Sequence, residues 1–189
     1  WKILNQGGIV DRTVNGVSEP IVKLADIDND NDLDVIFSSK SDYNGTKLLK
    51  FDGTKLVRDN NNPLSGINNV TNTEVSDING DGIADILVNT VNNSNSDLII
   101  YLSNNENIEI SPGNYSSQRV GDGLFNAKAR IVDLNNDGKA EIFLAGMSSN
   151  SINAEPKLYV YEYNNNSFTI NDVSSQIASL QNASYDLGD

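Results

Sequence analysis

Short apolar segments separated by polar turns recur along the chain in three groups of four. The first group comprises residues 21–25, 35–37, 48–51 and 55–57. The second comprises residues 74–76, 86–88, 98–102 and 108–110, and the third comprises residues 129–132, 142–144, 158–163 and 168–170. They are rich in branched and aromatic residues and bounded by Asn, Gly, Ser or Pro, which favours strands over helices. Only residues 173–180 have a weakly helical spacing. The pattern therefore predicts an all-β protein.

Four antiparallel strands in a repeat of just over 50 residues form the unit of a β-propeller blade. We therefore expect residues 1–189 to form one repeat region of about three β-propeller blades, with an open β-array or a sandwich as the alternative. A closed ring typically needs about four to eight blades. The prediction is thus a partial propeller whose remaining blades or domains lie elsewhere in the parent chain.

Both ends of the sequence suggest a piece of a longer repeat protein. The chain begins Trp1-Lys2-Ile3-Leu4, with neither an initiator methionine nor a signal peptide. Asp189 falls at the spacing where a fourth acidic loop would begin. We expect the chain to have been cut from a longer array.

A nine-residue acidic loop separates the first and second segments of each group. The loops, at 26–34, 77–85 and 133–141, align without gaps, and their first residues lie 51 and then 56 positions apart. Positions 1, 3, 5 and 9 supply side-chain oxygens, and position 7 would supply a main-chain carbonyl. The predicted metal ligands are Asp26, Asp28, Asp30, Asp32 and Asp34; Asp77, Asn79, Asp81, Ile83 and Asp85; and Asp133, Asn135, Asp137, Lys139 and Glu141.

This set of ligands predicts calcium, with one ion in each loop and three in all. Calcium takes about 6–8 oxygen ligands, whereas magnesium prefers small octahedral sites and zinc prefers nitrogen or sulfur. Position 6 is Gly82 or Gly138 in two loops and Asn31 in the first. Glycine and asparagine are the residues that best tolerate a left-handed backbone, so we expect a sharp turn there. Carboxylates this close together repel one another unless a cation lies among them.

The acid at position 9 separates these loops from other calcium motifs. An EF-hand loop needs an acid at position 12, which here is Phe37, Val88 or Leu144, inside a predicted strand. With a strand on each side, the stretches 25–30, 75–82 and 132–138 resemble the FG-GAP/VCBS repeat family. That resemblance implies an integrin-α-like, calcium-binding β-propeller in a secreted or cell-surface protein. The nearest approach to the Phe-Gly/Gly-Ala-Pro stretch of integrins is residues 121–125, which places the chain nearer the bacterial type.

Composition narrows the possible functions. The chain has no histidine and no cysteine, so neither a Ser-His-Asp nor a Cys-His arrangement can form. Its net charge of −13 disfavours nucleic acid, and no apolar run approaches the roughly 20 residues of a membrane-spanning helix. We expect no enzyme activity, no nucleic-acid partner and no membrane insertion.

The expected function is a rigid calcium-binding scaffold for binding or adhesion to an extracellular protein or glycan. The alternatives are an accessory propeller of a secreted carbohydrate-active enzyme and a calcium-dependent lectin. Exposed aromatic side chains would favour the glycan alternatives, and the candidates are Tyr43, Tyr115, Tyr161 and Tyr163. Alternation along a strand explains the last two as packing residues.

Overall fold

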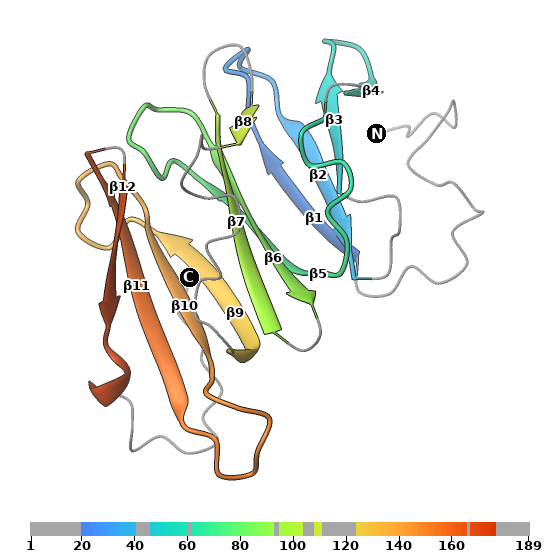
Figure 1. Ribbon diagram of the computed structural model, residues 1–189. Helices are drawn as coiled ribbons and strands as arrows, with labels where there is room; N and C mark the ends of the chain where they lie inside the picture. The colour runs from blue at the N-terminus through green and yellow to red at the C-terminus, as the bar shows by residue number, and fades with distance from the viewer. Residues whose placement is uncertain are drawn as a thin grey trace.

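Three antiparallel sheets of four strands each make up the computed structural model (Figure 1). It describes residues 20–40, 46–59, 62–92, 95–103, 108–110, 124–165 and 167–176. The first sheet comprises β1 (Pro20–Ala25), β2 (Asp34–Ser39), β3 (Lys47–Phe51) and β4 (Leu56–Arg58). The second comprises β5 (Val70–Ser76), β6 (Asp85–Asn92), β7 (Asn95–Ser103) and β8 (Ile108–Ile110). The third comprises β9 (Phe125–Val132), β10 (Glu141–Met147), β11 (Pro156–Asn164) and β12 (Ser167–Asp172).

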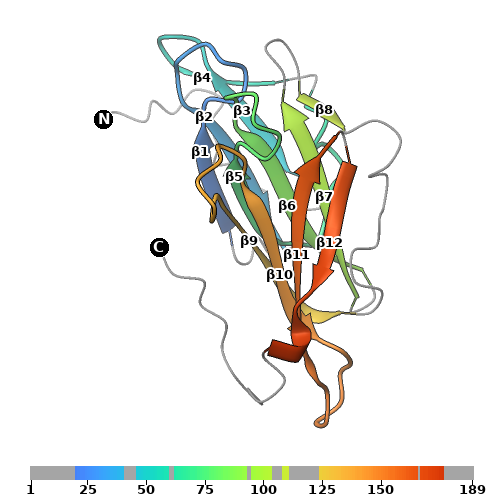
Figure 2. The same ribbon diagram turned by 90° about the vertical axis from the view of Figure 1, so that its left-hand side faces the viewer.

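Each sheet is a simple meander in which every strand pairs with its neighbour in sequence. The sheets lie face to face, and their first strands, β1, β5 and β9, are adjacent (Figures 1 and 2). This is the arrangement of three successive blades in a partial β-propeller, so the predicted all-β blade fold is confirmed. The weakest predicted strand, 74–76, is in fact the seven-residue β5, because polar Asn72 and Thr73 are held by neighbouring sheets.

The remaining expectations concern the predicted helical segment and the candidate exposed aromatic residues. The weakly helical segment 173–180 contains a single 3-10 turn, Ser174–Gln176, within its described part. Tyr161 is 2% exposed and Tyr163 packs edge-on against Phe168, so both are packing residues as expected. Tyr43 and Tyr115, and the glycines of the stretch 121–125, lie outside the described residues.

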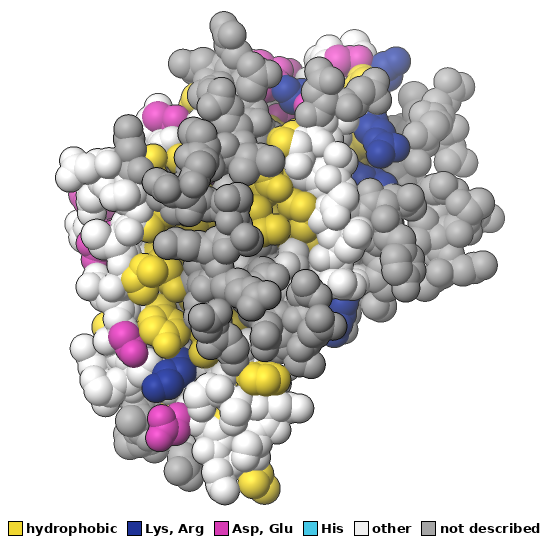
Figure 3. Space-filling model, in the orientation of Figure 1, with side chains coloured by type: hydrophobic (Ala, Val, Ile, Leu, Met, Phe, Trp, Pro, Cys, Tyr) yellow, Lys and Arg dark blue, Asp and Glu magenta, His cyan; other side chains and the backbone are white. Residues whose placement is uncertain are grey.

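Two apolar layers between the sheets hold the blades together. The run Ile86-Leu87-Val88 in the middle sheet is fully buried, with Ile86 and Val88 packed towards the first sheet and Leu87 towards the third. A strand covered on both faces needs apolar residues at consecutive positions instead of alternate ones, which explains this run. In the space-filling view, hydrophobic side chains are visible between neighbouring sheets and charged ones lie mainly around the rim (Figure 3).

A charged contact also joins all three blades. Glu74 on β5, 9% exposed, accepts a hydrogen bond at 2.7 Å from Lys23 on β1 and pairs through its other oxygen with Arg130 on β9. Lys23, Glu74 and Arg130 each stand three residues before the first Asp of their loop, so they are equivalent positions of the repeat. One carboxylate therefore links the first strands of three successive blades.

Glu74→Gln is expected to lower the free energy of unfolding by about 1–2 kcal/mol. The substitution keeps the shape but removes the charge that both cations share, and the partial exposure of Lys23 and Arg130 moderates the loss. Urea denaturation measures it. The control is Glu155→Gln, because Glu155 is exposed and its ion pair within the described residues is a long one, at 3.6 Å to Lys157 two positions on. Equal losses for the two variants would contradict a bridging role for Glu74.

Candidate metal centre

The three acidic loops lie in a row at one end of the sheets. Each joins the first strand of a blade to the second: β1 to β2, β5 to β6, and β9 to β10. In both ribbon views, the blue, green and yellow-orange loops follow one another along the same side of the molecule (Figures 1 and 2). The strand pairs hold the loop ends in register, for example Ala25 opposite Asp34 and Ser76 opposite Asp85. The repeat therefore places three similar loops at equivalent points.

The carboxylate at position 1 accepts hydrogen bonds from two backbone amides of its own loop. One of its oxygens accepts a hydrogen bond from the amide at position 5, and the other accepts one from the amide at position 6. The position 6 bonds are Asn31 N to Asp26 Oδ2 at 2.9 Å, Gly82 N to Asp77 Oδ2 at 2.8 Å and Gly138 N to Asp133 Oδ2 at 2.9 Å. The carboxylate at position 5 accepts in turn from the amide at position 7, at 2.9 Å in every loop.

Two left-handed residues make this tight loop possible. Position 6 has a positive φ in all three loops, 70° at Asn31 and 87° at both Gly82 and Gly138, as the sequence predicted. Position 4 is also left-handed, which the sequence analysis missed: φ is 61° at Asn29, 82° at Gly80 and 60° at Asn136. The available signal was that both positions carry only Asn or Gly in every copy.

The acid at position 9 is the buried member of each loop. Asp34, Asp85 and Glu141 are the first residues of β2, β6 and β10, with exposed fractions of 0%, 0% and 7%. Each accepts a hydrogen bond from the amide at position 2 of its loop. Asp34 and Asp85 also accept one from the third strand, from Phe51 N at 3.1 Å and Ser103 N at 2.8 Å. In the first two blades the acid thus ties the loop to two strands of its own blade.

Burial changes the ionisation of these acids. Desolvation raises the pKa of Asp34 from 3.8 to about 6 and that of Asp85 from 3.8 to about 7, although backbone amides that donate to both act in the opposite direction. Between about pH 4 and 7 the folded chain therefore holds more protons than the unfolded chain at these groups. Their contribution to the free energy of unfolding decreases as the pH rises through that window. A bound cation would lower these pKa values, because it favours the charged carboxylate.

The first loop brings three predicted ligands together. Asp26, Asp28 and Asp34 each place one carboxylate oxygen within 4.8 Å of the others. Asp28 Oδ2 pairs with Lys50 Nζ at 3.0 Å, while Asp28 Oδ1 is buried and finds no hydrogen-bond partner among the described residues. The sequence analysis did not identify Lys50, on β3, because it lies far from the loop along the chain and belongs to no motif. An unpaired buried carboxylate oxygen beside two further carboxylates suits a cation.

In the second and third loops an asparagine amide lies between the acids. Asn79 Nδ2 donates to Asp81 Oδ2 at 3.0 Å, and Asn135 Nδ2 donates at 3.1 Å to both Asp137 Oδ2 and Glu141 Oε1. In each loop a hydrogen-bond donor, either an asparagine NH2 group or the Lys50 ammonium, thus contacts the carboxylates that a metal ion would contact. Rotation of the amide would turn its oxygen towards an ion instead. The donor chemistry of all three loops therefore fits a hard cation.

The carbonyl ligands predicted at position 7 are less directly supported by the geometry. Asp32 and Lys139 are half-buried and Ile83 is 5% exposed, and their amides bond within the loops as described. No contact in the structure assigns a role to their carbonyl oxygens, so that part of the ligand set stays a prediction.

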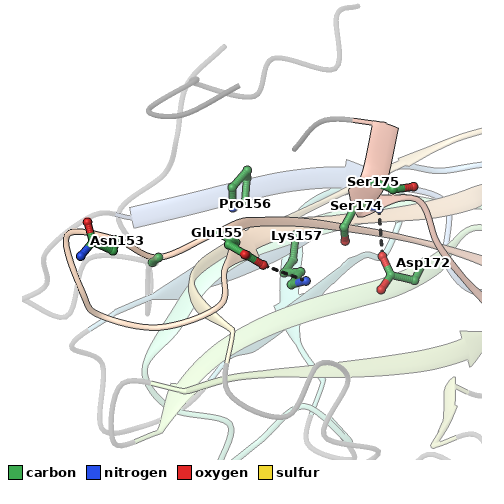
Figure 4. Close-up of a pocket in the computed structure, with 8 residues that line it drawn as sticks. Asn153, Glu155, Pro156, Lys157, Asp172, Ser174 and Ser175 are labelled. Carbon is green, nitrogen blue, oxygen red and sulfur yellow. Dashed lines mark hydrogen bonds and ion pairs between the residues drawn. The ribbon is translucent and has the colours of Figure 1, made fainter. Parts of the chain in front are cut away.

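A separate polar hollow lies on the third blade, where β11 begins and β12 ends (Figure 4). It has a volume of about 520 Å³, and its lining includes Glu155, which pairs with Lys157 at 3.6 Å, and Asp172, which accepts from Ser174 N at 2.9 Å. Among the described residues that line it, none carries an aromatic ring for a sugar to stack on.

The loop geometry and the sheet order define a β-propeller-like repeat protein with acidic loops between the first two strands of each blade. The family of FG-GAP-like repeats matches residues 24–88, which include the first two loops. Residues 24–88 therefore belong to the FG-GAP-like repeat family, as the motifs suggested. A search of curated proteins gives no match to the chain. In the part of the chain that the structure describes, no helix is long and apolar enough to cross a membrane.

Carboxyl carbon NMR is expected to detect ion binding directly at the buried acids. In calcium-free buffer, Asp34 should titrate near pH 6 and Asp85 near pH 7, and millimolar calcium should lower both pKa values, because the ion competes with the proton. Asp52 is the control: it is an exposed turn acid whose pKa is held below its usual value by hydrogen bonds from Thr54 and Lys55. Unchanged titration of Asp34 and Asp85 in calcium would contradict binding at these loops.

Proposed function

We propose that this chain is a calcium-binding repeat module of a secreted or cell-surface protein, in which the ions rigidify the blades. The observation that carries the proposal is the first loop, where Asp28 lies beside the carboxylates of Asp26 and Asp34 and has a buried Oδ1 with no hydrogen-bond partner among the described residues. The second and third loops repeat its hydrogen-bond scheme. FG-GAP-like repeats often bind calcium and are typical of extracellular proteins, which supports both parts of the proposal.

Each ion would be held by positions 1, 3, 5 and 9 of its loop, with the carbonyl of position 7 as a further ligand. The proposed ligands are Asp26, Asp28, Asp30, Asp34 and the carbonyl of Asp32; Asp77, Asn79, Asp81, Asp85 and the carbonyl of Ile83; and Asp133, Asn135, Asp137, Glu141 and the carbonyl of Lys139. Calcium accommodates such a shell of mixed carboxylate, amide and carbonyl oxygens. Its chemistry here is structural, since it would cross-link the turn between two strands and neutralise the acids.

A non-catalytic role agrees with how these acids are used. The carboxylates at positions 1, 5 and 9 already accept hydrogen bonds from loop or strand amides, so they are fixed in place as loop-forming groups. In this proposal the chain is a scaffold that presents its surface to an extracellular protein or glycan, as in adhesion. Extracellular modules often bind calcium with Kd values of roughly 10⁻⁴–10⁻³ M, which suits calcium-rich surroundings.

Calcium removal is expected to lower the melting temperature. An ion that binds only the folded loop stabilises it by about 1.4 kcal/mol at a tenfold excess over Kd, so three sites would contribute about 4 kcal/mol. Melting curves in EDTA, calcium and magnesium at matched ionic strength measure this, with poor rescue expected from magnesium. Equal midpoints in EDTA and millimolar calcium would refute the proposal.

Native mass spectrometry counts the bound ions in a separate experiment. Three calcium ions are expected on the unaltered chain and two on Asp26→Asn. Asp52→Asn is the matched control, because Asp52 also caps a tight turn but lies outside the loops; it should retain three.

A partner blade is proposed for the free face of the first sheet. Val22 and Leu24 on β1 are 56% and 55% exposed, and they lie opposite Phe37 and Val35 in the strand register. The residues equivalent to Val22 in the next two repeats, Thr73 and Ala129, are both 0% exposed, because the preceding blade covers them. The face of the first sheet thus repeats a surface that elsewhere packs against a blade. We place a further blade of the parent protein there.

Thiol labelling tests this partner. The chain has no cysteine, so Leu24→Cys introduces a single reactive group. In the complete parent protein its labelling should be slow, whereas Ile152→Cys, at a position that is 99% exposed, should label fast. In the 189-residue chain alone both should label fast. Fast labelling of both positions in the complete protein would exclude a covering blade.

A further inference from the structure

The second and third acidic loops are joined directly through their backbones. Ala140 N, at position 8 of the third loop, donates a hydrogen bond at 2.8 Å to the carbonyl oxygen of Asp77, position 1 of the second loop. Ala140 is 3% exposed, so this bond is shielded from water. Its donor belongs to the same peptide unit as the carbonyl of Lys139, a proposed ligand of the third ion. Its acceptor belongs to the residue whose carboxylate organises the second loop.

A side-chain contact reinforces this bond. The Lys139 side chain lies across Gly80, at position 4 of the second loop: a Cβ placed on Gly80 would stand 2.8 Å from Lys139 Cγ and 2.9 Å from Cε. Such separations are too short for real carbon atoms, so the contact requires a glycine. Position 4 is Asn29 in the first loop and Asn136 in the third, and only the second loop has glycine there. Gly80 thus leaves the space that the Lys139 side chain of the third loop occupies.

We infer that the second and third loops bind calcium cooperatively, each ion strengthening the binding of the other. This inference rests on the proposed function, since it concerns the same ions. An ion bound to the Lys139 carbonyl would polarise the Lys139–Ala140 peptide and strengthen the bond from Ala140 N–H to Asp77. That bond fixes the start of the second loop, so fewer degrees of freedom remain to be ordered when its own ion binds.

Linkage requires the coupling to be reciprocal. An ion in the second loop fixes Asp77 and Gly80, and these are the groups against which Ala140 and Lys139 of the third loop rest. The factor by which one ion raises the affinity of the other loop must therefore equal the converse factor. We expect a factor of about five, at the lower end of the range typical for coupled sites.

Glycine amide resonances provide a separate signal for each loop. In a calcium titration followed by NMR, Gly82 reports the second loop and Gly138 the third, because each amide donates to its loop's position 1 carboxylate. In the unaltered chain both resonances should shift. Asp137→Asn, which weakens the third loop, should raise the calcium concentration needed to fill the second loop about fivefold, and Asp81→Asn should do the same to the third.

Gly80→Asn tests the contact itself. Asparagine holds the same left-handed position in the other two loops, at φ of 61° and 60°, so the backbone tolerates it, while its Cβ displaces Lys139. In this background Asp137→Asn should no longer affect the second loop. The control is Gly82→Asn: Asn31 holds that position in the first loop, and a Cβ at Gly82 meets nothing within 4 Å. It should keep the coupling factor, with the Asp81 amide, which also donates to Asp77, as the reporter of the second loop in this variant.

The outcomes separate the two ideas. If neither glycine amide shifts with calcium in the unaltered chain, the proposed function fails and the coupling fails with it. If both shift but Asp137→Asn leaves the second loop's midpoint unchanged, the loops are independent and only the coupling is overturned. Equal loss of coupling in Gly80→Asn and Gly82→Asn would also overturn it, because the contact with Lys139 would then have no part in it.

Discussion

The rest of each blade is organised around the buried carboxylate that begins its second strand. In the first two blades, Asp34 and Asp85 fasten the start of the acidic loop to the third strand by accepting amides from both. A carboxylate removed from water is unfavourable when charged, as the raised pKa values of both groups indicate. The loop that it organises surrounds it with further acids. The same constraint that shapes the turn therefore gathers the carboxylates that would hold the proposed cation.

Between blades the structure relies on apolar layers with a few polar links. Glu74 joins three inner strands, and Asn72 and Asn89 donate to the carbonyls of Ala129 and Ala127 on β9 at 2.6 and 2.9 Å. These links to β9 form only when the neighbouring blade is in place. Since repeats of this kind cannot bury both faces alone, each blade depends on its neighbours. The exposed face of β1, with Val22 and Leu24, is the surface to which the proposed partner blade would bind.

The same stacking that buries the apolar faces brings the acidic loops into contact. Residues at positions 7 and 8 of the third loop meet positions 1 and 4 of the second, through Ala140 and Lys139. If the loops bind ions as proposed, the affinity of each loop would depend on its neighbour as well as on its own ligands. In the proposed function, a scaffold stiffened in this way would respond to calcium across blade boundaries.

The sequence by itself determined the elements that depend on local chemistry. Strand positions followed from branched apolar segments between turn residues, the repeat from three aligned loops, and the left-handed position 6 from its restriction to Asn and Gly. It underestimated β5, whose polar residues are held by other sheets, and gave no sign of Lys50 facing Asp28 or of Lys139 crossing Gly80. Those contacts join residues far apart in the chain, so no local spacing encodes them. Strand pairing within each sheet decided which amides satisfy the buried acids, and the stacking of the sheets decided which loops touch.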